Sequence, residues 1–510
     1  MLTRRNLKGM NVLIFLTDQE RAIQHFPRGW AKKNLPGEER LKRYGLTFPR
    51  AFCNACMCSP SRATLMTGYF PAQHGVKWTL EQGMPATQYP QQELPLHLLN
   101  LATVMTTVGY STPYKGKFHL TKAHNPSGTF VPEDVNQYGF QRWDPQDAGA
   151  NQDPSEFGGG DADNDGRFMN DDGPVKTGKE GVIAYLNSDA PKQGPFFLVV
   201  SLVNPHDVLA YPKTAFENGY NRKWVQGDIR LPATVNENLS TKPAVQQQFL
   251  TLTNLGLGHL TKQQQINYIN FYGNLMKSSD NYLVQVLDTL EERRMLENTL
   301  IIRTSDHGEM GLAHGGLRQK NFNFYEESLR IPLIYSNPKL YPKPQVSQAM
   351  VSHVDFLPTL ASLFDVPKSA RTGWQGVDYS QVVLNPKAKP PQKYIVFTYD
   401  DYQSGQPSGP YPGPLNHIVS IREERYKLAK YYDANCPDGP YEWEMYDLET
   451  DPLETKNLAY SGYKRTRKEQ KEYLRLRRQL AAVTQKRLQP LYGTKNILPR
   501  QATSHSANVR

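Results

Sequence analysis

Four short runs of apolar residues interrupt an otherwise polar chain and have the length of buried strands. They cover residues 11–16, 196–203, 299–303 and 332–335. Continuous apolar runs of this length, separated by longer segments, are typical of strands covered on both faces of a parallel sheet. The pattern therefore predicts an α/β fold with a mostly parallel central sheet flanked by helices.

Apolar residues spaced three and four positions apart predict the covering helices. One helix is expected from Gln263 to about Leu296, and another over residues 353–364. A third helical stripe lies within residues 464–489 and consists of Tyr473, Leu476, Leu480 and Val483. Because such a stripe buries one face only, this last helix is expected to dock on the body of the protein or on a sister subunit.

The character of the chain changes near residue 387. Proline-rich linkers surround a predicted strand at 394–398, and further short strands are predicted at 416–421, 426–431 and 444–448. We therefore expect a large α/β domain at 1–387, a small second domain at 388–460, and a basic helix and tail at 461–510.

The positive charge of the chain is local. The 510 residues include 59 Lys and Arg against 49 Asp and Glu, a formal charge of +10. Residues 461–510 alone hold 13 basic residues against Glu469 and Glu472, so the remainder is nearly neutral. This distribution favours a solvated helix face over a nucleic-acid surface. Two alternatives to a solvated face remain. The tail could form a homo-oligomer, or it could bind an anionic partner.

No apolar run approaches the ~18 residues that a membrane span requires. The run at 11–16 is also too short for the apolar region of a signal peptide. We therefore expect a cytoplasmic protein without a membrane partner. The four cysteines, at positions 53, 56, 58 and 436, exclude a disulfide-stapled scaffold.

Polar residues directly follow three of the predicted strands. Asp18-Gln19 follows the first, residues 204–207 (Asn-Pro-His-Asp) follow the second, and residues 306–309 (Asp-His-Gly-Glu) follow the third. A single aspartate after a strand is usually a turn or a helix cap. Open α/β sheets, however, bind ligands beyond the carboxyl ends of their strands, so three such clusters predict one shared active-site crevice.

The cysteine-rich segment 53–69 allows two interpretations. Cys53, Cys56 and Cys58 could bind zinc or an iron–sulfur cluster, but a second ligand pair at suitable spacing is missing, which favours buried apolar roles for Cys53 and Cys56. Alternatively, Ser59-Pro60-Ser61 starts a helix that Gly68 ends. Cys58 would then lie at the positive end of a helix, one turn before Arg62, in a setting suited to an anionic ester.

Cys58-Ser59-Pro60-Ser61-Arg62, followed by Leu65-Met66-Thr67-Gly68, resembles the type I sulfatase signature with its C-x-P-x-R core. Further blocks resemble the family in its order: Gly116-Lys117-Phe118-His119, Pro205-His206, Ser305-Asp306-His307-Gly308 with Lys320, residues 352–359, and Met445-Tyr446-Asp447-Leu448. The resemblance covers roughly residues 10–460. It implies an alkaline-phosphatase-like fold with a smaller C-terminal α+β domain that has a short antiparallel sheet.

The resemblance also implies an activity and the residues that carry it. The enzyme would hydrolyse a small-molecule sulfate monoester, in the manner of an arylsulfatase, after a formylglycine-generating maturation enzyme has converted Cys58 to formylglycine. One hydroxyl of the hydrated aldehyde attacks sulfur, and the second allows sulfate to leave. Arg62, Lys117 and Lys320 would bind the sulfate, His119 would assist its expulsion, and His206 would protonate the leaving group. A divalent metal ion would be bound by Asp18, Gln19, Cys58, Asp306 and His307.

This chain departs from the commonest sulfatase pattern at the predicted metal site. Asp-Gln and Asp-His replace the usual Asp-Asp and Asp-Asn, as in the subgroup that contains choline sulfatases and phosphonate monoester hydrolases. Calcium is the expected ion, with manganese or zinc as alternatives because of the imidazole. A phosphonate monoester hydrolase or phosphodiesterase therefore remains the alternative function.

Two further features have open interpretations. Residues 161–172 match the start of an EF-hand calcium loop but lack its final Glu and its flanking helices, which favours a polar loop near the pocket rim. His314, between Ala313 and Gly315, is expected to be structural, with an approach to the pocket as the alternative.

Overall fold

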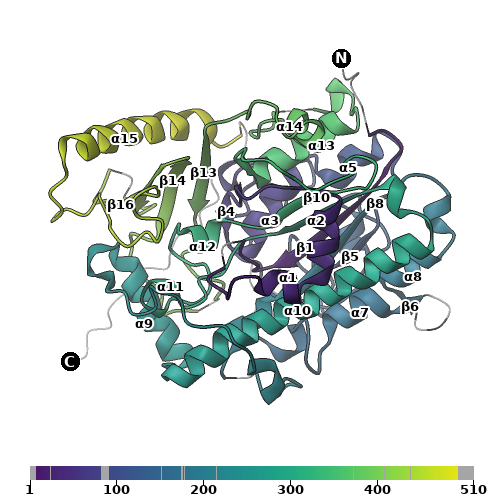
Figure 1. Ribbon diagram of the computed structural model, residues 1–510, viewed down its shortest axis with the longest axis horizontal. Helices are drawn as coiled ribbons and strands as arrows, with labels where there is room; N and C mark the ends of the chain where they lie inside the picture. The colour runs from purple at the N-terminus through teal and green to yellow at the C-terminus, as the bar shows by residue number, and fades with distance from the viewer. Residues whose placement is uncertain are drawn as a thin grey trace.

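The computed structural model describes residues 7–491, apart from the segment 82–90 and the single positions 23, 151, 174, 175, 177, 214, 372, 407 and 437. Two sheets dominate it (Figure 1). Among the described residues, no helix combines the length and the apolar composition that a bilayer span requires. The predicted tail beyond residue 491 lies outside the described residues.

The central sheet has seven strands in the order β11-β2-β10-β9-β1-β8-β5. Their bounds are β1 Asn11–Asp18, β2 Gly45–Thr47, β5 Tyr114–Gly116, β8 Phe197–Pro205, β9 Thr299–Ser305, β10 Leu333–Ser336 and β11 Gln345–Val346. The four adjacent strands β9, β1, β8 and β5 are mutually parallel, and β10 runs antiparallel to β9. The predicted α/β fold with a mostly parallel core is therefore confirmed.

Helices cover both faces of this sheet because β1 alternates its side chains between two cores. Val12, Ile14 and Leu16 pack in one core with residues of α3 (Cys58–Thr67), α5 (Leu101–Thr106) and α13 (Phe356–Leu363). Leu13 and Phe15 pack in the other core with α2 (Pro36–Arg43), α8 (Val182–Asn187) and α10 (Lys262–Glu292). Because helices cover both faces of the sheet, a ligand-binding site is expected at the carboxyl ends of its strands.

The second sheet has five strands in the order β16-β15-β14-β13-β4. Four are antiparallel neighbours: β13 Tyr394–Tyr399, β14 His417–Glu423, β15 Tyr426–Tyr432 and β16 Glu442–Asp447. The fifth, β4 (Ala55–Cys56), comes from the N-terminal part of the chain and pairs with β13. The C-terminal sheet is thus completed by the segment that leads directly into Cys58.

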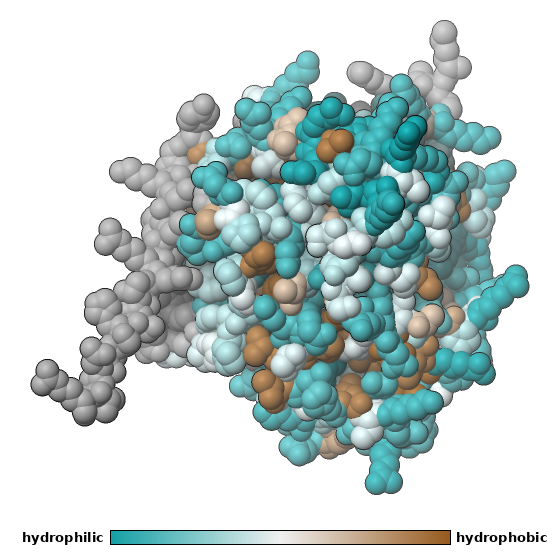
Figure 2. Space-filling view, turned by 90° about the vertical axis from the view of Figure 1, so that its left-hand side faces the viewer, coloured by the Kyte–Doolittle hydropathy of each residue, from teal (hydrophilic) through white to brown (hydrophobic). Residues whose placement is uncertain are grey.

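The C-terminal helix α15 (Arg467–Arg487) packs on this second sheet. Its buried residues are the predicted stripe of Tyr473, Leu476, Leu480 and Val483, which share a core with residues of β13–β16. Arg475 of this helix pairs with Glu423 of β14, whereas Lys468 and Lys471 are exposed. The end of the molecule that carries the second sheet is mostly hydrophilic, with scattered apolar residues (Figure 2).

Candidate active site

Predicted site residues lie at the carboxyl ends of the four parallel strands of the central sheet. β1 ends in Asp18, and β9 is followed by Asp306. β5 is followed by Lys117, and β8 by His206. Because carboxyl ends of parallel strands share an edge, four segments far apart in the chain supply one location.

Cys58 reaches the same location from a helix. It is the first residue of α3, and every residue of α3 is buried. Pro60 fits the first helical turn, and Gly68 ends the helix in the left-handed conformation at φ 70°. The positive end of the helix dipole therefore lies at the Cys58 position and favours a negative charge there.

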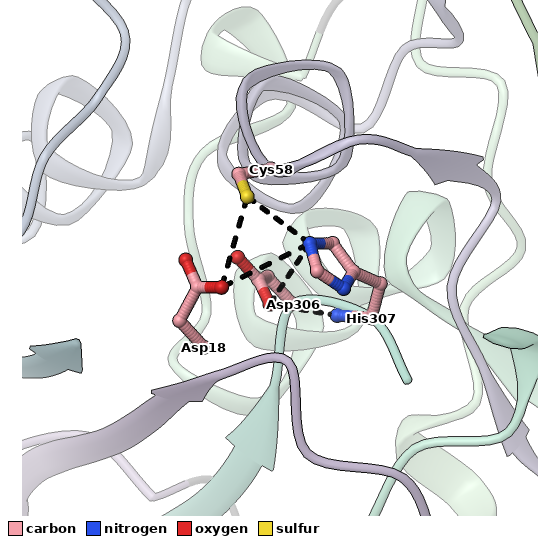
Figure 3. A group of neighbouring side chains, drawn as sticks. All are labelled: Asp18, Cys58, Asp306 and His307. Carbon is pink, nitrogen blue, oxygen red and sulfur yellow. Dashed lines mark hydrogen bonds and ion pairs between the residues drawn. The ribbon is translucent and has the colours of Figure 1, made fainter. Parts of the chain in front are cut away.

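Cys58, Asp18, Asp306 and His307 converge on a common point (Figure 3). One potential ligand atom from each lies within 4.8 Å of the other three, and all four residues are buried. The Cys58 sulfur lies 3.2 Å from His307 Nε2 and 3.7 Å from Asp18 Oδ1. His307 Nδ1 lies 3.0 Å from the Gly308 carbonyl, which leaves Nε2 directed at the group. These four residues form a group that could hold a metal ion.

Gln19 is oriented by two charged neighbours. Its Oε1 accepts a hydrogen bond of 2.6 Å from Lys320 Nζ, and its Nε2 donates to Glu309 Oε2 at 2.5 Å. Its backbone N–H donates to Asp306 Oδ1 at 3.0 Å. Gln19 and Lys320 are thereby held beside the four convergent residues.

Two buried cations bind the carboxylates of this group. Arg62 donates from Nε to Asp306 Oδ2 and from Nη2 to Asp18 Oδ2, both at 3.0 Å. Lys117 Nζ lies 2.5 Å from Asp18 Oδ2 and also donates to the Gly149 carbonyl. The site therefore balances two carboxylates against fixed positive charges.

The charge balance sets the ionisation of the two groups nearest the nucleophile position. Burial, and then the Asp18 charge, raises the pKa of the Cys58 thiol to about 11. Although burial opposes ionisation of Asp18, the charges of Lys117 and Arg62 hold its pKa well below the usual value. At neutral pH the encoded cysteine is therefore a protonated thiol and a poor nucleophile.

His119 and His206 are both buried near this group. Burial, followed by the charge of Lys117, holds the pKa of each imidazole well below its usual value. The His119 backbone N–H donates to Asp147 Oδ2 at 2.7 Å, and its Nε2 lies 2.5 Å from the Leu80 carbonyl. The neutral imidazole is thus the resting form of both residues.

Glu309 and Asp147 hold residues of the site in place, and no sequence motif predicts this role for them. The buried Glu309 carboxylate binds Gln19, Tyr268 and the backbone N–H groups of Gly311 and Gln319. Asp147 accepts the backbone N–H groups of Phe118 and His119. In the sequence, only the position of Glu309 within the polar cluster 306–309 indicates that it lies near the site.

His314 and the segment 161–172, the two features with open interpretations, form contacts outside the convergent group. His314 Nδ1 lies 2.7 Å from Glu237 Oε2, and its ring stacks on Tyr325. In the 161–172 segment, α7 (Asn164–Asn170) replaces an EF-hand loop, and Asp165 accepts the N–H groups of Val203 and Asn204. That carboxylate secures the end of β8 just before His206.

The remaining cysteines do not join the convergent group. Cys53 and Cys56 are buried with their sulfurs 4.0 Å apart, and Cys436 is exposed. Among the described residues, neither Cys53 nor Cys56 belongs to a set of side chains that could hold a metal. Their position fits the small buried apolar role.

The chain matches two family profiles. The sulfatase family matches residues 10–366, and the C-terminal region of N-sulphoglucosamine sulphohydrolase matches residues 314–485. An ulvan-active sulfatase of Formosa agariphila is 24% identical over 88% of this chain and 76% of its own. A choline-sulfatase of Rhizobium meliloti is 26% identical over 88% of this chain and 82% of its own.

Solved structures share the same fold. A 2-O GAG sulfatase superposes with a TM-score of 0.69 at 21% identity, covering 94% of this chain and 92% of the other. The phosphonate monoester hydrolase of Agrobacterium radiobacter gives 0.64 at 20% identity, covering 94% and 96%. Members of the sulfatase family generally use formylglycine and a divalent metal. The chain belongs to the sulfatase family and is a sulfuric ester hydrolase.

Proposed function

We propose that the convergent group is the catalytic centre and that residue 58, converted to formylglycine, is its nucleophile. The observation that carries this proposal is the location of Cys58 at the start of α3, 3.2 Å from His307 Nε2. Arg62, Lys117 and Lys320 are buried around it. Fixed cations in a water-poor site suit a sulfate monoester, because negative charge grows on its oxygens during reaction.

The donor set fits one divalent metal ion. Asp18, Gln19, Asp306, His307 and the oxygen of converted residue 58 would hold it, and the ion would supply Lewis acidity toward bound oxygen atoms. Four of these five donors are oxygens, so calcium is the proposed ion. The His307 imidazole makes manganese and zinc the alternatives. Metal analysis of the purified protein distinguishes them.

The side chains of this chain then have separate roles. Arg62, Lys117 and Lys320 bind and orient the sulfuryl oxygens. The hydrated aldehyde supplies one hydroxyl for attack at sulfur and a second one whose deprotonation allows sulfate to leave. His119, neutral at rest, accepts a proton from the hydroxyl that expels sulfate. His206 protonates the leaving alkoxide, aided by the negative charge of bound substrate, which raises the pKa of a neighbouring imidazole.

Peptide mass spectrometry tests the nucleophile. The protein is produced together with a formylglycine-generating maturation enzyme, and activity is measured on a small aryl sulfate. We expect an aldehyde at residue 58 in active protein and no activity in Cys58→Ala. Cys53→Ala is the matched control, because that cysteine is also buried but lies outside the convergent group. Fully active protein with intact Cys58 would contradict the proposal.

The second candidate function is hydrolysis of phosphonate monoesters or phosphodiesters at the same site. The presence of His307 among the proposed metal ligands favours keeping it, as does the fold shared with a phosphonate monoester hydrolase. We expect kcat/KM to be larger for an aryl sulfate than for an aryl phosphonate monoester or a phosphodiester. The reverse order would select the second function.

A carbohydrate sulfate is the proposed substrate class. Two of the similar proteins are named for such substrates, the ulvan-active sulfatase and the 2-O GAG sulfatase. The choline-sulfatase provides the competing small substrate. Release of sulfate from a panel of sulfated sugars, with choline sulfate beside them, distinguishes the two classes.

A further inference from the structure

A groove of about 670 Å³ lies between α15 and the outer face of the C-terminal sheet. Val419, Lys430 and Trp443 line it from the sheet, and Leu474, Arg477 and Arg478 line it from the helix. Its volume is in the range of ligand-binding pockets, about 300–1,000 Å³. The Leu474 side chain is 45% exposed, so an apolar surface is open to solvent there.

The groove lies on the face of the sheet opposite to the one that contacts α9 (Ala244–Leu257). Val419 pairs with Lys430 across β14 and β15, and Lys430 pairs with Trp443 across β15 and β16. The next residues along these strands, Tyr431 and Glu444, face the other way and bind Gln246 of α9. A ligand in the groove would therefore not occupy the catalytic centre.

The positive side chains of the groove are arranged on aromatic rings. The Arg477 guanidinium lies 4.6 Å from the centre of the Trp443 ring, and Lys430 Nζ lies 3.5 Å from that of Tyr441. Such stacking holds the cations in place while their hydrogen-bond donors stay available. The groove thus combines fixed cations with flat apolar surface.

Within the described part of the chain, these cations are not engaged in ion pairs. The groove has no acidic residue in its lining, and among the described residues Lys430, Arg477 and Arg478 form no ion pair. Arg475 on the same helix, by contrast, binds Glu423 and Glu472. Burial, and then the neighbouring Arg477, lowers the pKa of Lys430 against the opposing charge of Asp438. Positive charge is therefore crowded at the groove, with Asp438 as the opposing charge that acts on Lys430.

We propose that this groove is an accessory binding site for a segment of a sulfated polysaccharide. Sulfate groups would pair with Lys430, Arg477 and Arg478, and sugar rings would pack on Trp443 and Leu474. The choice of a sulfated glycan over another polyanion rests on the proposed function. A polymer held here would raise the effective concentration of its own ester groups at the catalytic centre.

Binding of dextran sulfate tests the proposal. The measurement uses the full chain carrying Cys58→Ala, so that no turnover occurs, and compares two double variants. Lys430→Ala with Arg477→Ala is expected to weaken the Kd about tenfold, because charge-assisted hydrogen bonds are lost. Lys468→Ala with Lys471→Ala removes the same charge from exposed positions of α15 outside the groove, and is expected to leave the Kd within about twofold.

A second comparison separates a glycan site from a general cationic surface. Trp443→Ala should weaken binding of dextran sulfate more than binding of poly(vinyl sulfate), which has no sugar rings. Equal losses in both double variants, or an equal loss of duplex DNA binding, would overturn the proposal. With Cys58 intact, the groove variants should keep the wild-type kcat/KM on a small aryl sulfate. Because binding is measured without turnover, a failed sulfatase assay would leave this result interpretable.

Discussion

At the scale of single residues, Arg62 connects both carboxylates that face Cys58. Besides its bonds to Asp18 and Asp306, its Nη1 donates to Ser201 Oγ at 2.8 Å and to the Lys117 carbonyl at 3.0 Å. A lysine ammonium cannot reproduce this planar fork. We expect Arg62→Lys to lower kcat/KM for a small aryl sulfate roughly a hundredfold.

Steady-state kinetics with a matched variant checks this expectation. Arg475→Lys also replaces an arginine that binds two carboxylates, but its partners lie on the C-terminal sheet and on α15 itself. It should leave kcat/KM unchanged. An Arg62→Lys enzyme with wild-type kinetics would show that the fork has no part in the reaction.

Glu309 determines which way the Gln19 amide faces. The carboxylate accepts the Gln19 Nε2–H, so the amide oxygen is turned toward Lys320. In Glu309→Gln, an amide N–H₂ can face the Gln19 N–H₂, and the orientation is no longer determined. We expect the metal concentration needed for half-maximal activity to rise about tenfold, because outer residues that orient ligands have effects of that size.

Glu444→Gln is the control for this prediction. Glu444 is equally buried and also accepts tyrosine hydroxyl groups, from Tyr431 and Tyr446, but it lies in the C-terminal sheet. Both variants should lower the melting temperature, and only Glu309→Gln should change the metal dependence. An identical metal dependence in the two variants would reduce Glu309 to a structural role.

At the scale of elements, the segment after β9 contains a buried titrating group. Burial alone would lower the pKa of His314, but its contacts with Glu237 and Glu327 raise it to about 9. A raised histidine pKa stabilises the fold below the unfolded value near 6.5, and this contribution is lost as pH rises toward 9. We therefore expect the free energy of unfolding to fall between pH 7 and 9, by about 3 kcal/mol at most.

Urea unfolding at several pH values measures this slope. His314→Gln should be less stable at pH 7 and nearly flat over the interval. His74→Gln should retain the wild-type slope, since burial and Lys77 lower the pKa of His74 to about 3 and it stays neutral throughout. A wild-type slope in His314→Gln would assign the pH dependence to other groups.

The elements that the sequence predicts well are those whose burial is visible locally. The strands β1, β8, β9 and β10 are continuous apolar runs, and α15 shows its buried stripe. Strands of two or three residues, such as β4 and β5, have too few positions to show a period. Pairing of β4 with β13, Ala55 opposite Thr398, depends on tertiary structure that no local pattern records.

The site, like the fold, has parts that the local sequence predicts and parts that depend on tertiary structure. The convergence of Asp18, Asp306 and His307 could be predicted because each follows a recognisable strand, whereas the expectation that Cys58 joins them comes from the resemblance to the sulfatase signature. Contacts such as Arg62 with Ser201, or Glu309 with Gln19, join segments more than 130 residues apart. They depend on side-chain packing across layers, which spacing along the chain cannot reveal.

At the scale of the whole molecule, the two sheets are joined by a buried network of charges. Glu326, in the catalytic part of the chain, binds Arg422 of β14 at 2.9 Å and Lys427 of β15 at 3.2 Å. Its backbone N–H donates to Glu454 Oε2 at 2.8 Å. Together with the β4–β13 pairing, this network links the catalytic segment to the C-terminal sheet through buried contacts.

We therefore expect a single calorimetric unfolding transition and a large effect of Glu326→Gln. The substitution removes the carboxylate partner of buried Arg422 and leaves buried Lys427 paired with Glu454 alone. Breaking a buried ion pair costs about 3–5 kcal/mol in comparable cases. Glu449→Gln, which removes an exposed partner of Arg425, should cost less than about 1 kcal/mol. If the C-terminal sheet melted in a separate, earlier transition while the central sheet persisted, the two sheets would be independent domains. A single transition that shifts strongly in Glu326→Gln alone is the result that cooperative coupling requires, because only that variant breaks a contact shared by both sheets.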